Sequence, residues 1–442
     1  MTSIPISPEI VKALAKNIGI PSPGSSSIRE IVHLVNKIEE QTGIKFIRME
    51  IGAPGLPAPS IGIEAEIAAL KNGVANIYPN IAGIEPLKKE TSRFIKLFLD
   101  ININPQGCIP TVGSMMGAMI SFLVANRNDK TKEGTLFIDP GFPVQKEQVK
   151  MLGHDYYSLD VYNYRGKKLK EKLESFLKSG RISSLLFSNP NNPSCICLTE
   201  EELEIIGELS RKYDVIVIED MAYFGMDFRK DYLYPGKPPF QPSVARYTDD
   251  YIILISSSKI FSYAGQRIGI MAISDQLFDR SYPDLLRYYS TEKFGHSVIF
   301  GALYGLSAGV AHSVQYGFAA LLKAVSDGTY RYRDDVIEYG KKAHEIKKMF
   351  ISNNFKIVYD SDLGEPLADG FYFTISYPGM TGSKLIEELL CYGISAISLE
   401  NTGSDRHEGL RACVSKVSWE QFSDLEIRLK KFSDDHPIKL NK

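Results

Sequence analysis

The sequence predicts an α/β protein whose larger part is a mostly parallel β-sheet covered by helices. Between about residues 105 and 270, short apolar runs alternate with amphipathic stretches, which is the pattern of strand–helix–strand units. Past about residue 320 the pattern changes to a long charged helix followed by strand-like runs and further helices. This change predicts a second, smaller unit of the α+β type.

Four apolar runs are the expected strands of the larger sheet: GTLFID, SSLLFS, DVIVIED and YIILIS. Between the second and third, TEEELEIIGELSRKY opens with Thr199 and carries Glu202 three positions later, which is the spacing of a capping box. Leu203, Ile206 and Leu209 then fall on one helical face. The segment is therefore predicted to be a crossover helix.

The smaller unit is expected to contain both ends of the chain. Its C-terminal part has the helical RYRDDVIEYGKKAHEIKKMFISNN, the strand-like FKIVYD and GFYFTIS, and the helical WEQFSDLEIRLKKF. Near the N-terminus, a helical REIVHLVNKIEEQTG and a strand-like FIRMEIG are too little to form a core alone. We expect a large domain at 60–320 and a small domain formed by 1–59 and 321–442.

Composition narrows the class of protein. Of 442 residues, 44% are apolar and 24% charged, as in ordinary globular proteins, and no apolar run has the length of a membrane-spanning helix. The net charge of −2 offers no basic surface for nucleic acid. The N-terminus does not resemble a secretory signal, and five scattered cysteines favour a reducing compartment. We expect a cytoplasmic protein that binds small molecules, with no membrane, nucleic-acid or metal partner.

Chemistry in such a sheet gathers beyond the carboxyl ends of its strands. Each predicted strand is followed there by polar or aromatic residues: Phe142 in PGFP, Asn192 in NPNNPSC, Asp220 and Tyr223 in EDMAY, and Ser256, Lys259 and Arg267 in SSSKIFSYAGQR. Upstream, TVGSMMGAMISFLVAN is a Gly-Ser turn that leads into an apolar helix. The N–H groups of its first residues, Gly113, Ser114 and Met115, suit a phosphate.

The lysine is the most informative of these residues. An isolated loop lysine is usually solvated, but an amine at the end of a buried strand can form a Schiff base. Ser256, Lys259 and Arg267 have the S-x-x-K spacing with an arginine eight residues later. This resembles the cofactor-lysine signature of the fold-type I, class I/II aminotransferases, which are pyridoxal-phosphate enzymes.

The resemblance runs over nearly the whole chain and implies a three-layer large domain with pyridoxal 5′-phosphate as cofactor. It implies that Lys259 forms the Schiff base and that Ser256 and Arg267 hold the phosphate. In D-x-x-Y, Asp220 keeps the pyridine nitrogen protonated, so the ring can act as an electron sink. Tyr223 bonds the phenolate oxygen of the ring.

Further motifs carry more of the cofactor site. NPNNPSC is similar to N-P-x-N-P-[ST]-G, in which Asn192 bonds the same phenolate oxygen; Cys195 stands where the family has glycine. Phe142 matches the aromatic residue that stacks on the ring. Gly113 and Ser114, together with Met115, match the phosphate-binding turn.

The remaining matches concern the second subunit and the substrate. YPNIAGIEPLKK resembles Y-x-x-x-x-G-x-x-x-L-[RK], in which Tyr78 reaches the phosphate of the neighbouring subunit, which implies a homodimer with shared sites. IGAPGLPAP and GLRACVS resemble the segments that supply Gly52 and Arg411 to the substrate carboxylate, while Asn192 also borders the substrate. The SLENTGSDRHEG loop before Arg411 departs from the family pattern.

We therefore expect an amino-acid aminotransferase with a ping-pong cycle, in which Lys259, Asp220 and Tyr223 are the catalytic residues. A pyridoxal-phosphate carbon–sulfur β-lyase shares these motifs and stays open as the alternative, and a non-catalytic cofactor-binding regulator is a more distant one. The motifs do not determine the amino donor or the keto acceptor. A dicarboxylic substrate needs a second cation, for which the region of Arg287, Lys293 and His296 is a candidate.

Overall fold

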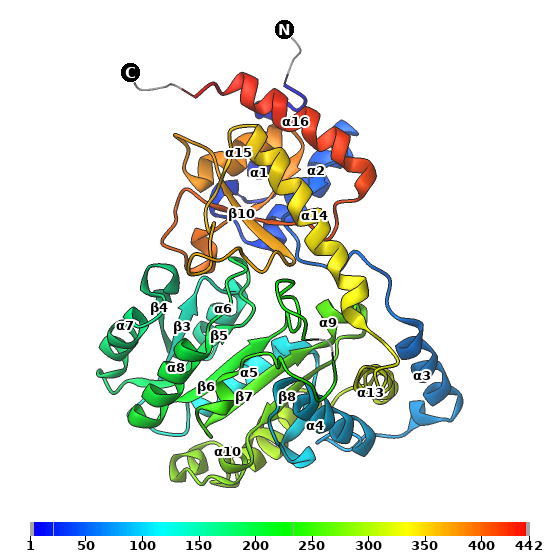
Figure 1. Cartoon of the computed structure of the whole chain (residues 1–442), viewed down its shortest axis with the longest axis vertical. Coiled ribbons are helices and arrows are strands. Elements are labelled where there is room, and N and C mark those ends of the chain that lie inside the picture. Colours follow the sequence, from blue (N-terminus) through cyan, green and yellow to red (C-terminus); the bar gives the residue numbers. More distant parts are fainter. Residues whose placement is uncertain (1–3, 21, 233, 439–442) are drawn as a thin grey trace. The chain divides into compact units, whose positions relative to one another are not determined.

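The protein forms two compact units, each described here by itself. The structure is a computed structural model that describes residues 4–20, 22–232 and 234–438. Unit 1 contains the chain up to Gly55, the short segment Asn192–Cys195, and the chain from Ile337 onward. Unit 2 contains Leu56–Asn191 and Ile196–Val336. Figure 1 shows their elements coloured along the sequence.

The described part of unit 2 is organised around a seven-stranded sheet with the order β2-β8-β7-β6-β5-β3-β4. Its strands are β2 (Cys108–Thr111), β3 (Gly134–Asp139), β4 (Asp155–Asp160), β5 (Ile182–Ser188), β6 (Ile216–Met221), β7 (Tyr251–Ser256) and β8 (Gly269–Ile273). The four apolar runs of the sequence are β3, β5, β6 and β7, which pair in parallel. The predicted mostly parallel sheet is confirmed, and β8 is its antiparallel exception.

The helices of unit 2 pack on this sheet or on one another (Figure 1). They are α3 (Ser60–Lys71), α4 (Glu85–Leu99), α5 (Gly113–Ala125), α6 (Pro143–Met151), α7 (Lys168–Leu177), α8 (Glu200–Tyr213), α9 (Ser257–Ile260), α10 (Asp275–Asp279), α11 (Phe294–His296), α12 (Tyr304–Ser307) and α13 (His312–Ser326). Helix α8 begins where the sequence predicts, because the Thr199 side chain accepts from the Glu202 N–H while the Glu202 side chain accepts from the Thr199 N–H.

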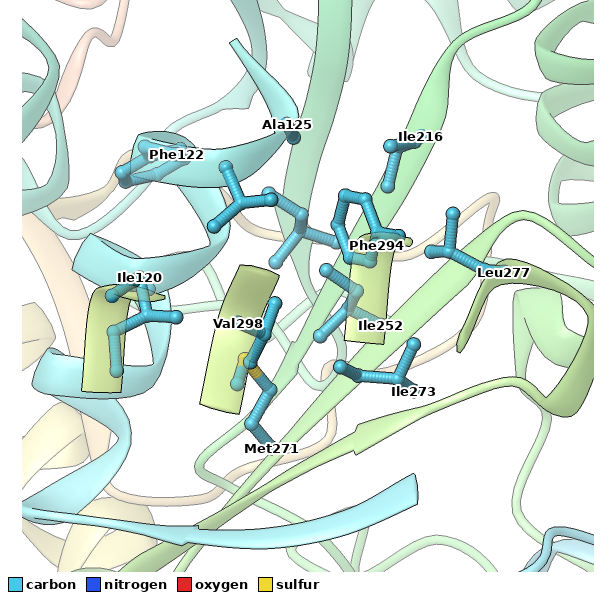
Figure 2. Packing of buried hydrophobic residues seen from close by; sticks show 14 of the residues in the cluster. Ile120, Phe122, Ala125, Ile216, Ile252, Met271, Ile273, Leu277, Phe294 and Val298 are labelled. Carbon is cyan, nitrogen blue, oxygen red and sulfur yellow. The ribbon is translucent and has the colours of Figure 1, made fainter. Parts of the chain in front are cut away.

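The core of unit 2 lies between α5 and one face of the sheet. Helix α5 is apolar on nearly all sides and largely buried, as expected for a helix inside a three-layer domain. Figure 2 shows Ile120 and Phe122 of α5 with Ile252 of β7 and Met271 of β8 in one cluster. Val298 extends it from a π-helix at Ser297–Leu303. This packing fixes α5 against the middle of the sheet.

Unit 1 combines helices with two small sheets. The helices are α1 (Pro8–Asn17), α2 (Ile28–Thr42), α14 (Tyr332–Ser352, which begins in unit 2), α15 (Gly382–Cys391) and α16 (Phe422–Asp435). The first sheet is antiparallel, with the order β12 (Ile397–Ser398), β13 (Leu410–Cys413), β10 (Tyr372–Ser376) and β9 (Lys356–Ile357). The second pairs β1 (Ile47–Arg48) in parallel with β11 (Ile394–Ser395). No helix in the described ranges is long and apolar enough to cross a membrane.

Candidate active site

The residues predicted to bind the cofactor collect at one edge of the large sheet, on the face covered by α5. Side chains alternate along a strand, so Asp220 shares a face with the core residue Ile218, and Ser256 shares it with Leu254. Asp220 pairs with Leu254 in the sheet register. Both polar residues therefore continue an apolar stripe to its carboxyl end, where α5 begins.

Asp220 is buried, with 6% of its surface exposed. Its Oδ2 accepts from Gln145 Nε2 at 2.8 Å, and its Oδ1 accepts from the Ala222 N–H at 3.1 Å. Burial raises the pKa of Asp220 to about 6, while Gln145, the Ala222 N–H and the Lys259 ammonium act in the opposite direction. Within the described residues Asp220 has no ion-pair partner. An uncompensated carboxylate here is suited to a cationic group on a ligand.

Gln145 is a site residue that the motif comparison did not identify. It lies in the first turn of α6, three residues after Phe142, and is 3% exposed. The available signal was a glutamine in a helix that starts directly behind a predicted cofactor contact. A sequence pattern could not show that its amide faces Asp220, because that contact joins residues 75 positions apart.

Lys259 and Tyr223 lie in the turns that follow β7 and β6. Lys259 is the third residue of the short helix α9 and is half-buried. Ser256 caps that helix, accepting from the Ser258 N–H at 3.2 Å. Tyr223 is buried in the turn after Asp220. The strand pairing thus brings the predicted lysine and acid to neighbouring strand ends, close enough for Lys259 to lower the pKa of Asp220.

The turn at Gly113 and the side chain of Arg267, which are both predicted to bind the phosphate, face each other. Gly113 has φ +69°, and a Cβ there would lie 2.5 Å from Arg267 Nη2, so the turn requires glycine. Arg267 Nη1 donates to the carbonyl oxygen of Ala264 at 2.9 Å and to Ser258 Oγ at 3.4 Å. Both acceptors are neutral, and the guanidinium meets no carboxylate in the part of the chain that is described.

The sheet register explains why the Gly113 turn lies next to Arg267. Gly269 of β8 pairs with Thr111 of β2 and with Ser256 of β7, and a Cβ on Gly269 would lie 2.7 Å from the Ser114 N–H nitrogen. Helix α5 has no acidic residue in its first turn and no side-chain cap. A free helix N-terminus beside an arginine without an acid is complementary to a phosphate dianion. The residues present therefore fit pyridoxal phosphate, with a cationic phosphate cradle at one end and Asp220 at the other.

The loops after β3 and β5 are tied together. Phe142 precedes α6 and is partly exposed. Asn191 Nδ2 donates to the carbonyl oxygen of Pro140 at 2.8 Å, which fixes the loop that carries Phe142. Asn192, the predicted phenolate ligand, is 4% exposed and belongs to the short segment grouped with unit 1. Cys195 has φ +57°, so it takes the left-handed conformation that favours glycine.

Both residues predicted to bind the substrate carboxylate lie in unit 1. Arg411 on β13 is 1% exposed, and its Nη2 donates to the carbonyl oxygen of Glu50 at 2.7 Å. Its Nε has no acceptor, and it forms no ion pair with any carboxylate of the described chain. Tyr372 of β10 places its ring centroid 4.7 Å from Arg411 Cζ. A Cβ on Gly52 would lie 1.9 Å from the Tyr372 hydroxyl oxygen, so only glycine fits there.

Tyr372 is a second residue that the motifs did not identify. It was read only as part of the strand-like GFYFTIS, and its place beside Arg411 follows from the register of two strands. Thr374 pairs with Arg411 in that register, and Tyr372 is two residues away on the same face. A buried guanidinium that lacks an acid and is stacked on an aromatic ring suits a ligand carboxylate.

Tyr78 lies on the surface of unit 2 and is 94% exposed. The cations considered for a dicarboxylic substrate have local contacts: Arg287 faces Asp284, Lys293 Nζ donates to the carbonyl oxygen of Asp279, and His296 packs on Phe278 and Phe300. No group of three or more His, Cys, Asp or Glu able to hold a metal occurs among the residues described.

Comparisons with known proteins identify the family of the chain. Residues 45–338 match the family model described as aminotransferase class I and II. The chain is 24% identical to an aspartate aminotransferase of Pyrococcus horikoshii over 83% of each protein. It is 26% identical to a probable aspartate aminotransferase of Methanocaldococcus jannaschii, in a match that spans 57% of this chain and 61% of that protein.

The fold has solved counterparts. The structure of an alanine aminotransferase from Pyrococcus furiosus superimposes with a TM-score of 0.74 at 20% identity, covering 94% of this chain and 98% of that one. At this identity the likeness establishes the fold alone. The family model, which covers about two thirds of the chain, establishes the family.

Proposed function

Since the chain belongs to the class I and II aminotransferases, whose cofactor is pyridoxal 5′-phosphate, we propose that an amino acid and a 2-oxo acid react at one site in turn, by a ping-pong cycle. The observation that carries the proposal is the buried Asp220 carboxylate, which has no ion-pair partner among the described side chains and is close enough to Lys259 for the ammonium to lower its pKa. The relatives are named for aspartate and for alanine, so the amino donor is left to experiment.

The cofactor is held at three points. Gly113, Ser114 and Met115 present N–H groups to its phosphate, joined by Arg267 and Ser256. Phe142 would lie against its ring, and Asn192 and Tyr223 would donate to its phenolate oxygen. Support comes from the free N-terminus of α5 and from the neutral surroundings of Arg267. When bound, the group supplies an aldehyde for an amine and a ring that stabilises negative charge at the substrate α-carbon.

Each residue of the chain has a distinct task. Asp220 holds a proton at the facing ring nitrogen, and Gln145 keeps the Asp220 carboxylate in place. Lys259 would hold the cofactor through its amine and would move a proton at the substrate α-carbon. Arg411 binds the substrate carboxylate with the help of the Gly52 backbone, so that the α-proton, rather than the carboxylate, is the group removed.

The two compact units divide this work. Unit 2 is the cofactor-binding domain, and unit 1 supplies the residues for the substrate carboxylate. This assignment is supported by the location of Lys259, Asp220 and Arg267 in unit 2 and of Gly52 and Arg411 in unit 1. None of the five cysteines, all within the described ranges, forms a disulfide, which supports a reducing, cytoplasmic location.

The active form is a homodimer in which Tyr78 of one subunit binds the phosphate in the other. Support comes from large apolar side chains that are exposed on two segments, Ile77 and Tyr78 on one and Phe300, Tyr304 and Leu306 on the other. The two segments adjoin, since a Cβ on Gly309 would lie 3.4 Å from Ile81 Cα. Patches of large exposed aromatic side chains mark protein interfaces.

Mixed dimers test the shared site. A Tyr78→Ala protein and a Lys259→Ala protein should each be impaired, but a mixture that exchanges subunits should regain activity, because one site of the mixed dimer then has both residues intact. No regain, with exchange confirmed by tagged subunits, contradicts the shared site.

A test of the main proposal uses Lys259→Ala. The wild type should give a borohydride-reducible link to the cofactor on the peptide that contains residue 259, and should transfer amino groups to a 2-oxo acid. The variant should keep the wild-type circular dichroism spectrum but show neither property. Full turnover by the variant excludes the mechanism.

The carbon–sulfur β-lyase remains the second candidate because it uses the same residues. Release of pyruvate, ammonia and thiol from a sulfur amino acid without a 2-oxo acid would favour it. A folded protein that binds the cofactor but supports neither reaction would favour the non-catalytic regulator.

A further inference from the structure

Glu50 lies at the point where the residues for the substrate carboxylate are attached to the body of unit 1. Its carbonyl oxygen accepts from Arg411 Nη2 at 2.7 Å, and Gly52 follows two residues later. Glu50 itself is fully buried. Its position therefore sets both the guanidinium and the backbone that, in the proposed function, bind the carboxylate.

The backbone ladder does not extend to Glu50. β1 (Ile47–Arg48) pairs with β11, and the last bond of this pairing joins the Met49 N–H to the carbonyl oxygen of Ser395 at 3.0 Å. Beyond Met49 the chain leaves the sheet. The Met49 carbonyl oxygen accepts from the Cys413 N–H at 2.8 Å, and the side chain of Glu50 provides the next anchor along the chain.

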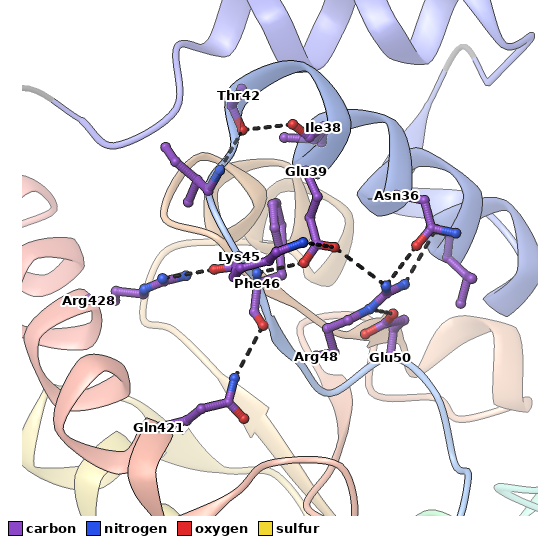
Figure 3. A network of polar contacts seen from close by, with 12 residues as sticks. Asn36, Ile38, Glu39, Thr42, Lys45, Phe46, Arg48, Glu50, Gln421 and Arg428 are labelled. Atoms are coloured by element: carbon purple, nitrogen blue, oxygen red, sulfur yellow. Dashed lines mark hydrogen bonds and ion pairs between the residues drawn. The ribbon is translucent and has the colours of Figure 1, made fainter.

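Both carboxylate oxygens of Glu50 have partners. Oε1 accepts from Arg48 Nε at 2.9 Å, and Oε2 accepts from Ser395 Oγ at 2.6 Å. Figure 3 shows Arg48 between Glu50 and helix α2, where its Nη1 donates to Asn36 Oδ1 at 2.7 Å. Glu39 Oε2 lies 3.9 Å from the same guanidinium nitrogen. Glu50 is thus joined to a helix and a strand through its side chain.

This arrangement also keeps Arg411 available. Glu50 is the acidic residue whose backbone touches Arg411, yet its carboxylate is occupied by Arg48 and Ser395. Arg411 contacts the Glu50 carbonyl dipole and the Tyr372 ring but no carboxylate of the described chain, so its positive charge is left for a ligand. Buried charge pairs with good geometry hold groups in place even where they add little net stability.

We propose that Glu50 is a positioning residue for the substrate carboxylate: its anchored side chain fixes the carbonyl that orients Arg411 and the backbone that leads to Gly52. The inference rests on the proposed function, because it needs a substrate with an α-carboxylate. The proposal attributes the effect of Glu50 on substrate binding to the position in which its side chain is held, and not to its negative charge.

The experiment compares two variants on two substrates. Glu50→Ala removes both anchors, whereas Glu50→Gln keeps the shape and can still bond Arg48 and Ser395. Each is assayed with the best amino-acid donor and with the amine that lacks only its carboxylate. We expect Glu50→Ala to raise KM for the amino acid about tenfold with little change in kcat, the loss typical of a misplaced charge-assisted contact.

The amine is the internal control. Its half-reaction, followed by cofactor absorbance, should stay within about twofold of wild type in every variant, because it makes no contact that Glu50 positions. Glu50→Gln should restore most of the amino-acid KM. The matched truncation Glu39→Ala, which removes the other carboxylate near Arg48, should leave both substrates unchanged.

Three results would overturn the inference: equal losses on amine and amino acid, no loss on either, or a Glu50→Gln variant as impaired as Glu50→Ala. If Glu50→Ala does not fold, Ser395→Ala, which removes one anchor, decides by the same comparison with an expected KM increase of about threefold. A wild-type protein that transfers no amino group refutes the proposed function itself, before any variant is compared.

Discussion

Replacing Asp220 with asparagine should stabilise the cofactor-free protein while it abolishes activity. The carboxylate is buried beside two neutral donors, Gln145 Nε2 and the Ala222 N–H. Asparagine has the same shape, and the amide of Gln145 can turn to present its oxygen. The substitution therefore removes the charge without opening a cavity.

The expected gain in free energy of unfolding follows from the pKa of Asp220. Burial is the largest influence and raises the pKa from 3.8 to about 6, against the opposing effects of Gln145, the Ala222 N–H and Lys259. One pKa unit corresponds to about 1.4 kcal/mol, so a difference of about two means that the ionised group destabilises the folded protein by ~3 kcal/mol.

The direction of the pKa shift determines the pH range in which ionised Asp220 destabilises the folded protein. A raised carboxyl pKa means that the folded state holds the proton more tightly than the unfolded state does. The penalty is absent below about pH 3.8, grows between there and about pH 6, and is complete above. Asp220→Asn should therefore gain ~1 kcal/mol at pH 4.5 and ~3 kcal/mol at pH 8 in free energy of unfolding.

Denaturant unfolding of the cofactor-free wild type and variant, at pH 4.5, 6 and 8, measures this gain. With cofactor added, amino transfer by the variant should fall on the order of a thousandfold, since the ring nitrogen loses its anion. Equal stability of the two proteins at all three pH values would refute the argument that the carboxylate is charged and uncompensated in the folded state.

Three further substitutions have distinct outcomes. Gln145→Leu removes a hydrogen bond to a charged group and should weaken cofactor binding about tenfold in an absorbance titration, whereas Val149→Ala on the same helix should not. Arg411→Leu should raise KM for an amino acid about a hundredfold, with Arg411→Lys intermediate because lysine keeps the charge but not the planar fork. Cys195→Gly should lower the free energy of unfolding less than Cys195→Ala does, because glycine adopts a positive φ without strain and alanine does not. The difference should be about 1 kcal/mol. The reverse order would contradict backbone strain at this residue.

The large sheet could be predicted because its signals are local. The runs that became β3, β5, β6 and β7 are apolar on both faces, as strands buried between helix layers must be. The start of α8 was predicted because Thr199 and Glu202 satisfy each other's backbone groups within one turn. β8 was not identified, since an antiparallel strand within this pattern gives no local sign of its direction.

The candidate site could be predicted only where a motif is contiguous. Lys259 and Asp220 come from such motifs, and the register of β6 and β7 brings them to neighbouring strand ends. Gln145, Tyr372 and Glu50 act through contacts with residues far away in the chain. Their importance depends on how strands and helices pack, which is a property of the assembled fold and not of any short stretch.

Residues proposed to bind a ligand differ from structural residues in whether their buried charge has an oppositely charged partner. Arg165 and Glu202 are nearly or fully buried, and the guanidinium donates from both Nε and Nη2 to the carboxylate at 2.7 and 2.9 Å. In such a pair each charge is compensated by the other, so no ligand is required. Asp220 and Arg411 are as inaccessible, but their hydrogen bonds in the described chain are to neutral groups alone. Because unpaired buried charge is destabilising, the proposed function accounts for both residues: a protonated ring nitrogen would complete the acid, and an α-carboxylate would complete the arginine.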